Sequence, residues 1–391
     1  MKKFLCFIAV IALIVGAYIF APDIKQYADD YIAAKTSVDW EEYSAEPSEL
    51  GSKYKNHFDA LSENQKKAYS NILGAVLNSE EQFPDEIEVP MMTGDELTAV
   101  FESVIYDNPT VSCFGTNCSI ITRGELCYFK PDYIMTAGEF KQKTAELDAK
   151  AAEILTGIPS GADEYEKELF IHDYIINNCT YDDSRSPSAS MIYSCLIDGS
   201  AACEGYAKSA KFLLEKAGLE CYTVVGKARN KNGESENHMW NIVGIGGGYY
   251  HLDLTWDDPS GEKETLSHTY MNLTEQEIML DHFDFNSEFE CTATQANYFN
   301  KSGLLFDSFN SGDYKLLQKK LAQNALSSKK RIEIRFTSSE AFDKGYERLI
   351  EKGSAYYLAK NINRQYGTDL SEKNIEYTKD ENFRVIELIF E

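Results

Sequence analysis

Apolar residues recur at helical spacing through the first part of the chain. Leu61–Leu77, Thr93–Tyr106 and Ala137–Leu155 carry them at intervals that predict three amphipathic helices. The stretch Asp107–Pro109 ends the second of these helices cleanly. Between Val111 and Tyr133 the sequence favours a pair of short strands.

The middle of the chain mixes helix and strand. The segment Gly157–Gly161 combines glycine, proline and serine, so we place the end of a mainly helical N-terminal domain, residues 22–158, at this point. In the following block, residues 159–300, helices are predicted over Glu164–Asn177 and Tyr206–Ala217.

A third block covers residues 301–391. Strands are expected at Arg331–Phe336 and Arg384–Phe390, with helices near Glu340–Lys352 and Tyr356–Gln365 between them. This βαβ-like pattern has no glycine-rich loop, and we expect a small α/β module that serves binding or packing.

The first residues have the pattern of an export segment. Lys2 and Lys3 precede Phe4–Ala21, which carries no charge, and Asp23 follows. Such a segment is typical of a cleaved secretory signal or of an uncleaved membrane anchor, and the sequence leaves both open. In either case we expect residues 1–21 to direct export of the rest of the chain, which would be held at the cell surface by an anchor in the membrane or secreted if the segment is cleaved.

Composition and charge narrow the class of function. The chain has 43% hydrophobic and 13% aromatic residues, which is enough for a sizeable core. Its 38 basic and 63 acidic residues give a formal net charge of −25. Such a surface repels nucleic acid, so we expect no nucleic-acid partner.

One cysteine lies in a reactive position. Cys203 follows Gly199–Ala202 and opens a predicted helix, where the positive end of the helix dipole favours a thiolate. A thiolate is the nucleophilic form of cysteine. Taken alone, Cys203 is better explained as a buried core cysteine, which is a common place for this residue type.

A histidine and an aspartate could act as the base and the orienting carboxylate that a cysteine nucleophile needs. His238 opens a strand after a polar loop, and Asp253 lies in the next strand beyond a turn centred near Gly246. Antiparallel pairing would place His238 opposite residue 253 or 254, within side-chain reach of the carboxylate. Singly, His238 could be structural and Asp253 a strand-end cap. Together with Cys203 they supply nucleophile, base and orienting carboxylate in chain order.

These segments resemble the signature blocks of the bacterial transglutaminase-like superfamily. The resemblance rests on Cys203–Ala207, His238–Asn241 and Asp253–Asp257, and the stretch from His172 to Asp182 resembles the helix that opens this domain. It implies an α+β, papain-like core within residues 159–300. Cys203 would then be the nucleophile, His238 the general base and acid, and Asp253 the residue that orients the imidazole.

The resemblance also implies the reaction. An acyl-enzyme thioester would form at Cys203 on a peptide or protein amide, and water or an amine would release it; cell-wall peptides are one substrate class suited to an exported protein. The backbone N–H of Cys203 and a second donor, for which we name Tyr193, would hold the oxyanion. The alternative is a catalytically silent binding or scaffolding module that retains the fold.

No cofactor or metal is required by this chemistry. The acidic runs near Asp257 and Asp281 are interpreted as solvated surface rather than a calcium site. Nine cysteines are present. Cys113, Cys118 and Cys127 lie close enough in sequence to include a disulfide, and their irregular spacing argues against zinc.

Overall fold

The computed structural model describes residues 51–184, 186–230, 233–258 and 266–391. The expected export segment therefore lies outside the described residues. Across the described ranges, no helix combines the length and the apolar character needed to cross a membrane. By their internal contacts these residues form two compact units, which are described separately.

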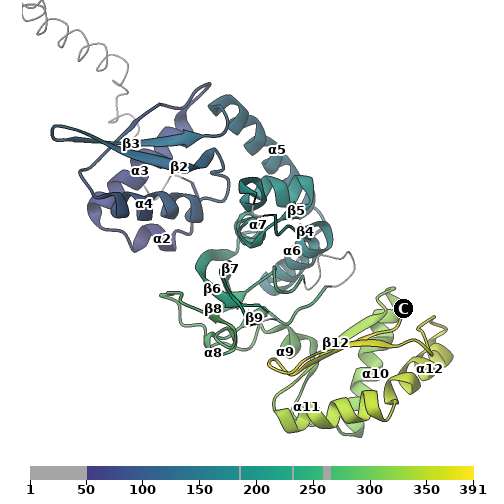
Figure 1. Ribbon diagram of the computed structural model, residues 1–391. Helices are drawn as coiled ribbons and strands as arrows, with labels where there is room; N and C mark the ends of the chain where they lie inside the picture. Colours follow the sequence, from purple (N-terminus) through teal and green to yellow (C-terminus); the bar gives the residue numbers. More distant parts are fainter. Residues whose placement is uncertain (1–50, 185, 231–232, 259–265) are drawn as a thin grey trace, which may run out of the picture. The chain divides into compact units, whose positions relative to one another are not determined.

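The first unit contains Phe58–Val104 and Cys113–Lys141 and combines helices with one sheet (Figure 1). Its sheet is antiparallel with the strand order β1-β3-β2, and the predicted strand pair is confirmed as β2 and β3. The three helices that the apolar pattern predicted are confirmed. The elements are α3 (Glu63–Asn78), β1 (Ile87–Val89), α4 (Gly94–Asp107), β2 (Phe114–Arg123), β3 (Leu126–Tyr133) and the start of α5 (Ala137–Leu155).

The second unit contains Tyr54–His57, Ile105–Ser112 and Gln142–Glu391 and is built on a five-stranded antiparallel sheet with the order β10-β6-β7-β8-β9. Gly246 and Gly247 form the turn between β7 and β8, where both have positive φ angles (60° and 80°) that glycine adopts without strain. The strands are β6 (Glu220–Arg229), β7 (Ser235–Ile245), β8 (Gly248–Leu252), β9 (Met271–Leu273) and β10 (His282–Phe283).

Two helices that pack against each other lie beside this sheet. α6 (Glu164–Asn178) begins at a capping box, in which the carboxylates of Asp163 and Glu166 each accept the other residue's backbone N–H at 2.8 and 2.9 Å. α7 (Cys203–Lys216) packs on β6 and β7 and ends before Gly218, whose φ is 86°. Tyr206, Leu213 and Val243 belong to the apolar core between these layers.

Short elements lead from α6 to α7. A parallel strand pair joins Thr180 to Ser200 and Tyr181 to Ala201, so the chain after α6 runs beside the residues that precede α7. The elements are β4 (Thr180–Tyr181), the 3-10 helix η1 (Pro187–Ser190), the π-helix η2 (Ser194–Asp198) and β5 (Ser200–Ala201).

The last residues form a four-stranded sheet with the order β11-β12-β14-β13, in which β11 and β12 are parallel and the other pairs antiparallel. The predicted strand Arg331–Phe336 is confirmed as β12. The remaining elements are α8 (Glu275–Ile278), α9 (Tyr298–Ser302), β11 (Leu305–Phe306), α10 (Ser311–Leu326), α11 (Ser339–Tyr346), η3 (Glu347–Glu351), α12 (Ser354–Tyr366), β13 (Glu376–Asp380) and β14 (Val385–Ile389).

One apolar core connects the two sheets of the second unit. Trp240 and Ile242 of β7 belong to the same buried cluster as Phe336, Phe383 and Leu388. The fold class is α+β, as the sequence predicted. All eight cysteines within the described ranges are free thiols, including the three for which a disulfide was considered.

Candidate active site

Cys203 is the first residue of α7, as the sequence predicted, and its side chain is partly exposed. Ala202 precedes it in an extended conformation and supplies no side-chain cap. The first amides of a helix have no partner within the helix. An uncapped helix start beside a thiol therefore leaves backbone donors available to an anion.

The residues around Cys203 hold the start of α7 tightly. The Ala202 N–H donates to the Ala189 carbonyl at 2.9 Å. A Cβ atom at Gly205 would lie 2.7 Å from that same carbonyl oxygen and 2.7 Å from the Cβ of Ala201. Position 205 therefore requires glycine, which explains the small residue two positions after the cysteine.

His238 lies in β7, opposite Gly226 of β6, and is buried. Its Nε2 atom is 2.7 Å from Oδ2 of Asp253. Cys203 lies near enough to raise the pKa of this imidazole, and Nδ1 is the ring nitrogen that Asp253 leaves open. The structure therefore brings together Cys203, His238 and Asp253 in the order expected for a thiol triad.

The contact between His238 and Asp253 does not arise from the predicted strand pairing. β8 pairs with β7 only as far as Leu252, which lies opposite Asn241. The expected cross-strand pair between His238 and residue 253 or 254 is therefore not formed. Asp253 instead begins a turn, and its side chain reaches back to the histidine.

Asp253 is almost fully buried, and its two carboxylate oxygens accept four hydrogen bonds from the protein. Oδ2 accepts from His238 and, at 3.0 Å, from Nε2 of His282. Oδ1 accepts the backbone N–H groups of Thr255 at 2.9 Å and Trp256 at 3.3 Å. Burial would raise the pKa of Asp253, but the charge of His238 and the hydrogen bonds from both histidines outweigh it and lower the pKa well below its usual range.

The same pairing favours the charged form of His238. Burial lowers the pKa of this imidazole, whereas the charge of Asp253, the hydrogen bond to Asp253 and the nearby Cys203 raise it. The net effect is a pKa of about 10. His238 is thus an imidazolium at neutral pH, which is the partner that a cysteine thiolate requires.

Tyr193 is placed away from this contact. Its hydroxyl donates to Oε2 of Glu146 at 2.7 Å, and the Lys143 ammonium lies 3.7 Å from the centre of its ring. Among the described residues, no hydrogen bond links Tyr193 to Cys203 or His238. Its role as an oxyanion donor stays a prediction.

A different tyrosine, Tyr181, lies beside the triad. It pairs with Ala201, two residues before the nucleophile, and its side chain is partly exposed. Burial raises its pKa to about 12, and the nearby charges of Cys203, Glu236 and Asp253 contribute. Sequence reasoning noted this tyrosine only as part of the segment that opens the domain.

The turn that begins at Asp253 is fastened to the helix that carries the nucleophile. The hydroxyl of Tyr206, one helical turn after Cys203, donates to Oδ2 of Asp258 at 2.7 Å. Within the turn, the Asp258 N–H donates to the Thr255 carbonyl at 3.3 Å. The two parts of the triad are thereby connected through buried polar side chains.

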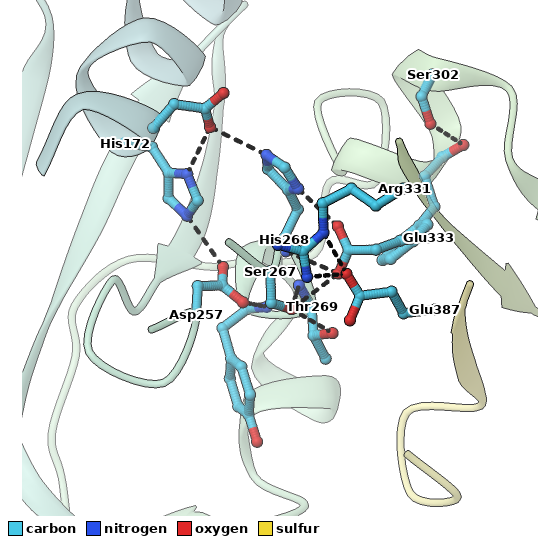
Figure 2. A network of polar contacts seen from close by, with 12 residues as sticks. His172, Asp257, Ser267, His268, Thr269, Ser302, Arg331, Glu333 and Glu387 are labelled. Carbon is cyan, nitrogen blue, oxygen red and sulfur yellow. Dashed lines mark hydrogen bonds and ion pairs between the residues drawn. The ribbon is translucent and has the colours of Figure 1, made fainter. Parts of the chain in front are cut away.

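The same turn is also fastened to α6 and to the segment before β9. Asp257 is fully buried, and its Oδ2 atom lies 3.1 Å from Nε2 of His172 (Figure 2). Its Oδ1 atom accepts the Tyr270 N–H at 2.9 Å, and its carbonyl accepts the Ser267 N–H at 2.9 Å. The expectation that the run near Asp257 is solvated surface is wrong, because these carboxylates have protein partners.

Glu333 of β12 extends this network into the last sheet. It accepts from the Ser267 hydroxyl at 2.9 Å, the His268 N–H at 3.2 Å and the ring Nδ1 of His268 at 2.7 Å (Figure 2). The other ring nitrogen of His268 lies 3.0 Å from Asp173, and the ring stacks on Tyr298 at 3.8 Å. Glu333 therefore holds Ser267 and His268 in place. Ser267 in turn bonds to Asp257 in the turn that begins at Asp253, which we call the catalytic turn.

Three clusters within the described ranges have ligand atoms close enough together to share a metal ion. In each cluster, every histidine has at least one ring nitrogen within hydrogen-bond distance of a carboxylate. The clusters are His172, Asp173 and His268; His238, Asp253 and His282; and His251, Glu275 and Cys291, where the Trp240 indole donates to Nδ1 of His251 at 3.0 Å and Nε2 lies 2.8 Å from Glu275.

The comparison with protein families agrees with this geometry. Residues 151–254 match the model of the transglutaminase-like superfamily. No curated protein is similar enough to the chain to be matched. The resemblance predicted from the sequence is confirmed for this segment, which is a transglutaminase-like domain.

Solved structures resemble part of the chain at low identity. A transglutaminase structure is 19% identical over 49% of this chain and 56% of its own, with a TM-score of 0.25. A candidate cysteine protease from Cytophaga hutchinsonii is 10% identical over 44% of this chain and 66% of its own (TM-score 0.26). A candidate protease from Parabacteroides distasonis is 11% identical over 39% and 41% (TM-score 0.22). This chain covers less than two thirds of each, and scores this low carry no argument about activity.

Proposed function

We propose that this protein is a thiol enzyme that acts on peptide or protein amides outside the cytoplasm. The observation that carries the proposal is the buried contact of His238 with Asp253 at 2.7 Å, with Cys203 near enough to raise the pKa of the same imidazole. These three groups supply a nucleophile, a proton carrier and the carboxylate that orients it. The domain class fits this chemistry.

In the first step, the Cys203 thiolate attacks the amide carbonyl carbon and the carbonyl electrons move to oxygen. The backbone N–H at the uncapped start of α7 and a second donor stabilise the resulting oxyanion, and Tyr181 fits the second role better than Tyr193 because Tyr193 is bonded to Glu146. His238 then gives its proton to the leaving amine, the C–N bond breaks and a thioester remains.

In the second step, His238 takes a proton from water or from an amine as it attacks the thioester. The thiolate leaves, and the product is an acid or a new amide. Support for an extracellular location comes from the charge-free segment after Lys3, and an exported bacterial enzyme would meet cell-wall peptides there. The competing proposal is a binding module that retains the triad without turnover.

The rate of iodoacetamide alkylation at Cys203 separates these proposals. We expect the full chain to alkylate rapidly at pH 6, where an ordinary thiol with a pKa of ~8.5 is hardly ionised. His238→Ala should remove that reactivity, because the imidazolium partner is lost. Peptide mass spectrometry measures each cysteine separately, and the exposed Cys118 is an internal reference in the same sample.

A Cys203 that reacts no faster than Cys118 at pH 6 in both proteins would contradict the enzyme proposal and favour the binding module. If the reactive thiolate is found, the next measurement is turnover of peptide amides with and without an added primary amine. Release of acid alone indicates hydrolysis, and incorporation of the amine indicates transamidation.

A further inference from the structure

Asp253 has a second histidine partner that the triad does not include. Nε2 of His282 lies 3.0 Å from Oδ2 of Asp253, the same oxygen that accepts from His238. Nδ1 of His282 lies 2.6 Å from Oδ1 of Asp281, and the Tyr270 hydroxyl donates to the other oxygen of Asp281 at 2.7 Å. These residues form one hydrogen-bonded chain that ends at the catalytic carboxylate.

We propose that His282 is a positioning residue of the active site, held as an imidazolium between Asp281 and Asp253 so that Asp253 is fixed for His238. The inference rests on the proposed function for its catalytic meaning. The position and the charge of His282 can be tested without a substrate.

The protonation state of His282 follows from its two partners. A carboxylate that is ionised only accepts hydrogen bonds, so each ring nitrogen must carry a proton to bond with it. Asp281 accepts from Tyr270 as well as from His282, which is the pattern of an ionised group. Burial lowers the pKa of His282, but the hydrogen bonds to Asp253 and Asp281 outweigh it and raise the pKa.

Charges therefore alternate along the chain from Asp281 to the nucleophile. Negative Asp281 is followed by positive His282, negative Asp253 and positive His238, which lies near Cys203. Each buried charge has an opposite charge on its neighbour, which offsets the cost of removing it from water. Two other titratable groups face this chain. Burial and the charge of Asp281 raise the pKa of the Tyr270 hydroxyl, whereas burial and the charge of His282 lower the pKa of His251.

Aromatic rings hold His282 in place. The ring centres of Trp240 and Trp256 lie 4.8 and 4.7 Å from that of His282, and Tyr270 lies at 5.9 Å. Both tryptophans also contact His238, at 5.9 and 5.7 Å. With its ring enclosed and both nitrogens bonded, His282 prevents Asp253 from rotating away from His238.

Three substitutions separate hydrogen bonding from charge. His282→Gln keeps an N–H donor for Asp253 but removes the charge, and His282→Phe removes both while keeping an aromatic ring. Asp281→Asn keeps an acceptor for His282 but removes the negative charge. His57→Gln is the matched control, because His57 bonds to Thr223 and does not contact the triad.

Alkylation of Cys203 against pH is the first readout. We expect His282→Phe to lower the maximal rate by roughly 10- to 100-fold, the scale expected when reacting groups are misplaced by about 1 Å. His282→Gln should restore most of that rate, with the profile moved to higher pH because a positive charge is lost. Asp281→Asn should move the profile in the opposite direction, and His57→Gln should not move it.

The second readout is the ring nitrogen NMR spectrum of ¹⁵N-labelled full chain. The six histidines of the sequence are few enough to assign by single substitutions. We expect both nitrogens of His282 to be protonated at pH 7. A neutral His282, or unchanged alkylation in both His282 variants, would overturn the inference even if Cys203 is reactive. An unreactive wild-type Cys203 would overturn the proposed function instead, while the NMR spectrum still decides the state of His282.

Discussion

The hydroxyl of Tyr206 lies 2.7 Å from Oδ2 of Asp258, and this bond joins the helix of the nucleophile to the turn of the orienting carboxylate. Cys203 and Asp253 come from different elements, so their relative position depends on contacts of this kind. Burial and the neighbouring charge of Asp258 raise the pKa of Tyr206, so its hydroxyl stays protonated and remains a donor at neutral pH.

Tyr206→Phe should therefore weaken both stability and reactivity. Removing a hydrogen bond to a buried charged group costs about 1.5–3 kcal/mol of unfolding free energy, and urea unfolding followed by tryptophan fluorescence measures it. We also expect slower alkylation of Cys203 at pH 6. Tyr249→Phe is the control, because its hydroxyl bonds to Glu220 and not to the catalytic turn; equal effects of the two substitutions would contradict the assigned link.

Asp253→Asn should change the charge state of His238. The carboxylate is what overcomes the effect of burial, so its loss lets the pKa of His238 fall from about 10 toward or below the ordinary value of 6.5. The imidazolium then disappears at neutral pH. By analogy with other triads we expect a loss of about 10⁴-fold in turnover.

The measurement is peptide hydrolysis at pH 7 together with Cys203 alkylation from pH 5 to 9. Asp284→Asn, an exposed residue paired with Lys227, is the matched control. Normal alkylation at pH 6 in Asp253→Asn would argue that the thiolate does not depend on this pair.

The second oxyanion donor can be identified with two matched phenylalanine substitutions. If Tyr181 donates to the oxyanion, Tyr181→Phe lowers kcat by roughly 10²-fold and leaves Cys203 alkylation unchanged, since alkylation forms no oxyanion. Tyr193→Phe should have little effect on kcat because that hydroxyl is bonded to Glu146. The reverse result would restore Tyr193 as the donor.

Glu333→Gln should make stability less dependent on pH. Burial lowers the pKa of His268, but Asp173 and Glu333 outweigh it and raise the pKa from 6.5 to about 10. A raised histidine pKa stabilises the fold fully below pH 6.5, and this contribution is lost as the pH rises toward 10. Removing one partner of a buried ion pair costs about 3 kcal/mol at neutral pH.

The check is the unfolding free energy of wild type and variant between pH 6 and 10. The difference between the two proteins should be largest near pH 6 and shrink toward pH 10. Glu340→Gln, which removes an exposed partner of Lys344 in the same sheet domain, should produce no measurable change at any pH. A constant difference across the range would mean that His268 is not the titrating group.

The triad was predictable because each member stands in a local sequence pattern. Cys203 opens a helix after small residues, and His238 and Asp253 flank a glycine turn. The exact route between them was not predictable, because β8 ends at Leu252 and Asp253 turns back instead of pairing. A strand's end is decided by its tertiary neighbours rather than by alternation alone.

The residues that support the triad were not predictable in the same way. His282, His268 and Glu333 come from segments far apart in the chain, and no motif joins them. Asp257 was misread as surface because a run of acidic residues is usually solvated, whereas its buried carboxylate bonds to His172 and to the backbone N–H of Tyr270. Only the folded chain reveals that a charged side chain has partners.

The continuous core beneath the catalytic sheet has an evolutionary consequence. Trp240 and Ile242 share it with Phe336, Phe383 and Leu388, so each part covers apolar surface of the other. Recombination that moved the catalytic part alone into another protein would expose this surface and favour aggregation. The two parts are therefore expected to be inherited together as one unit.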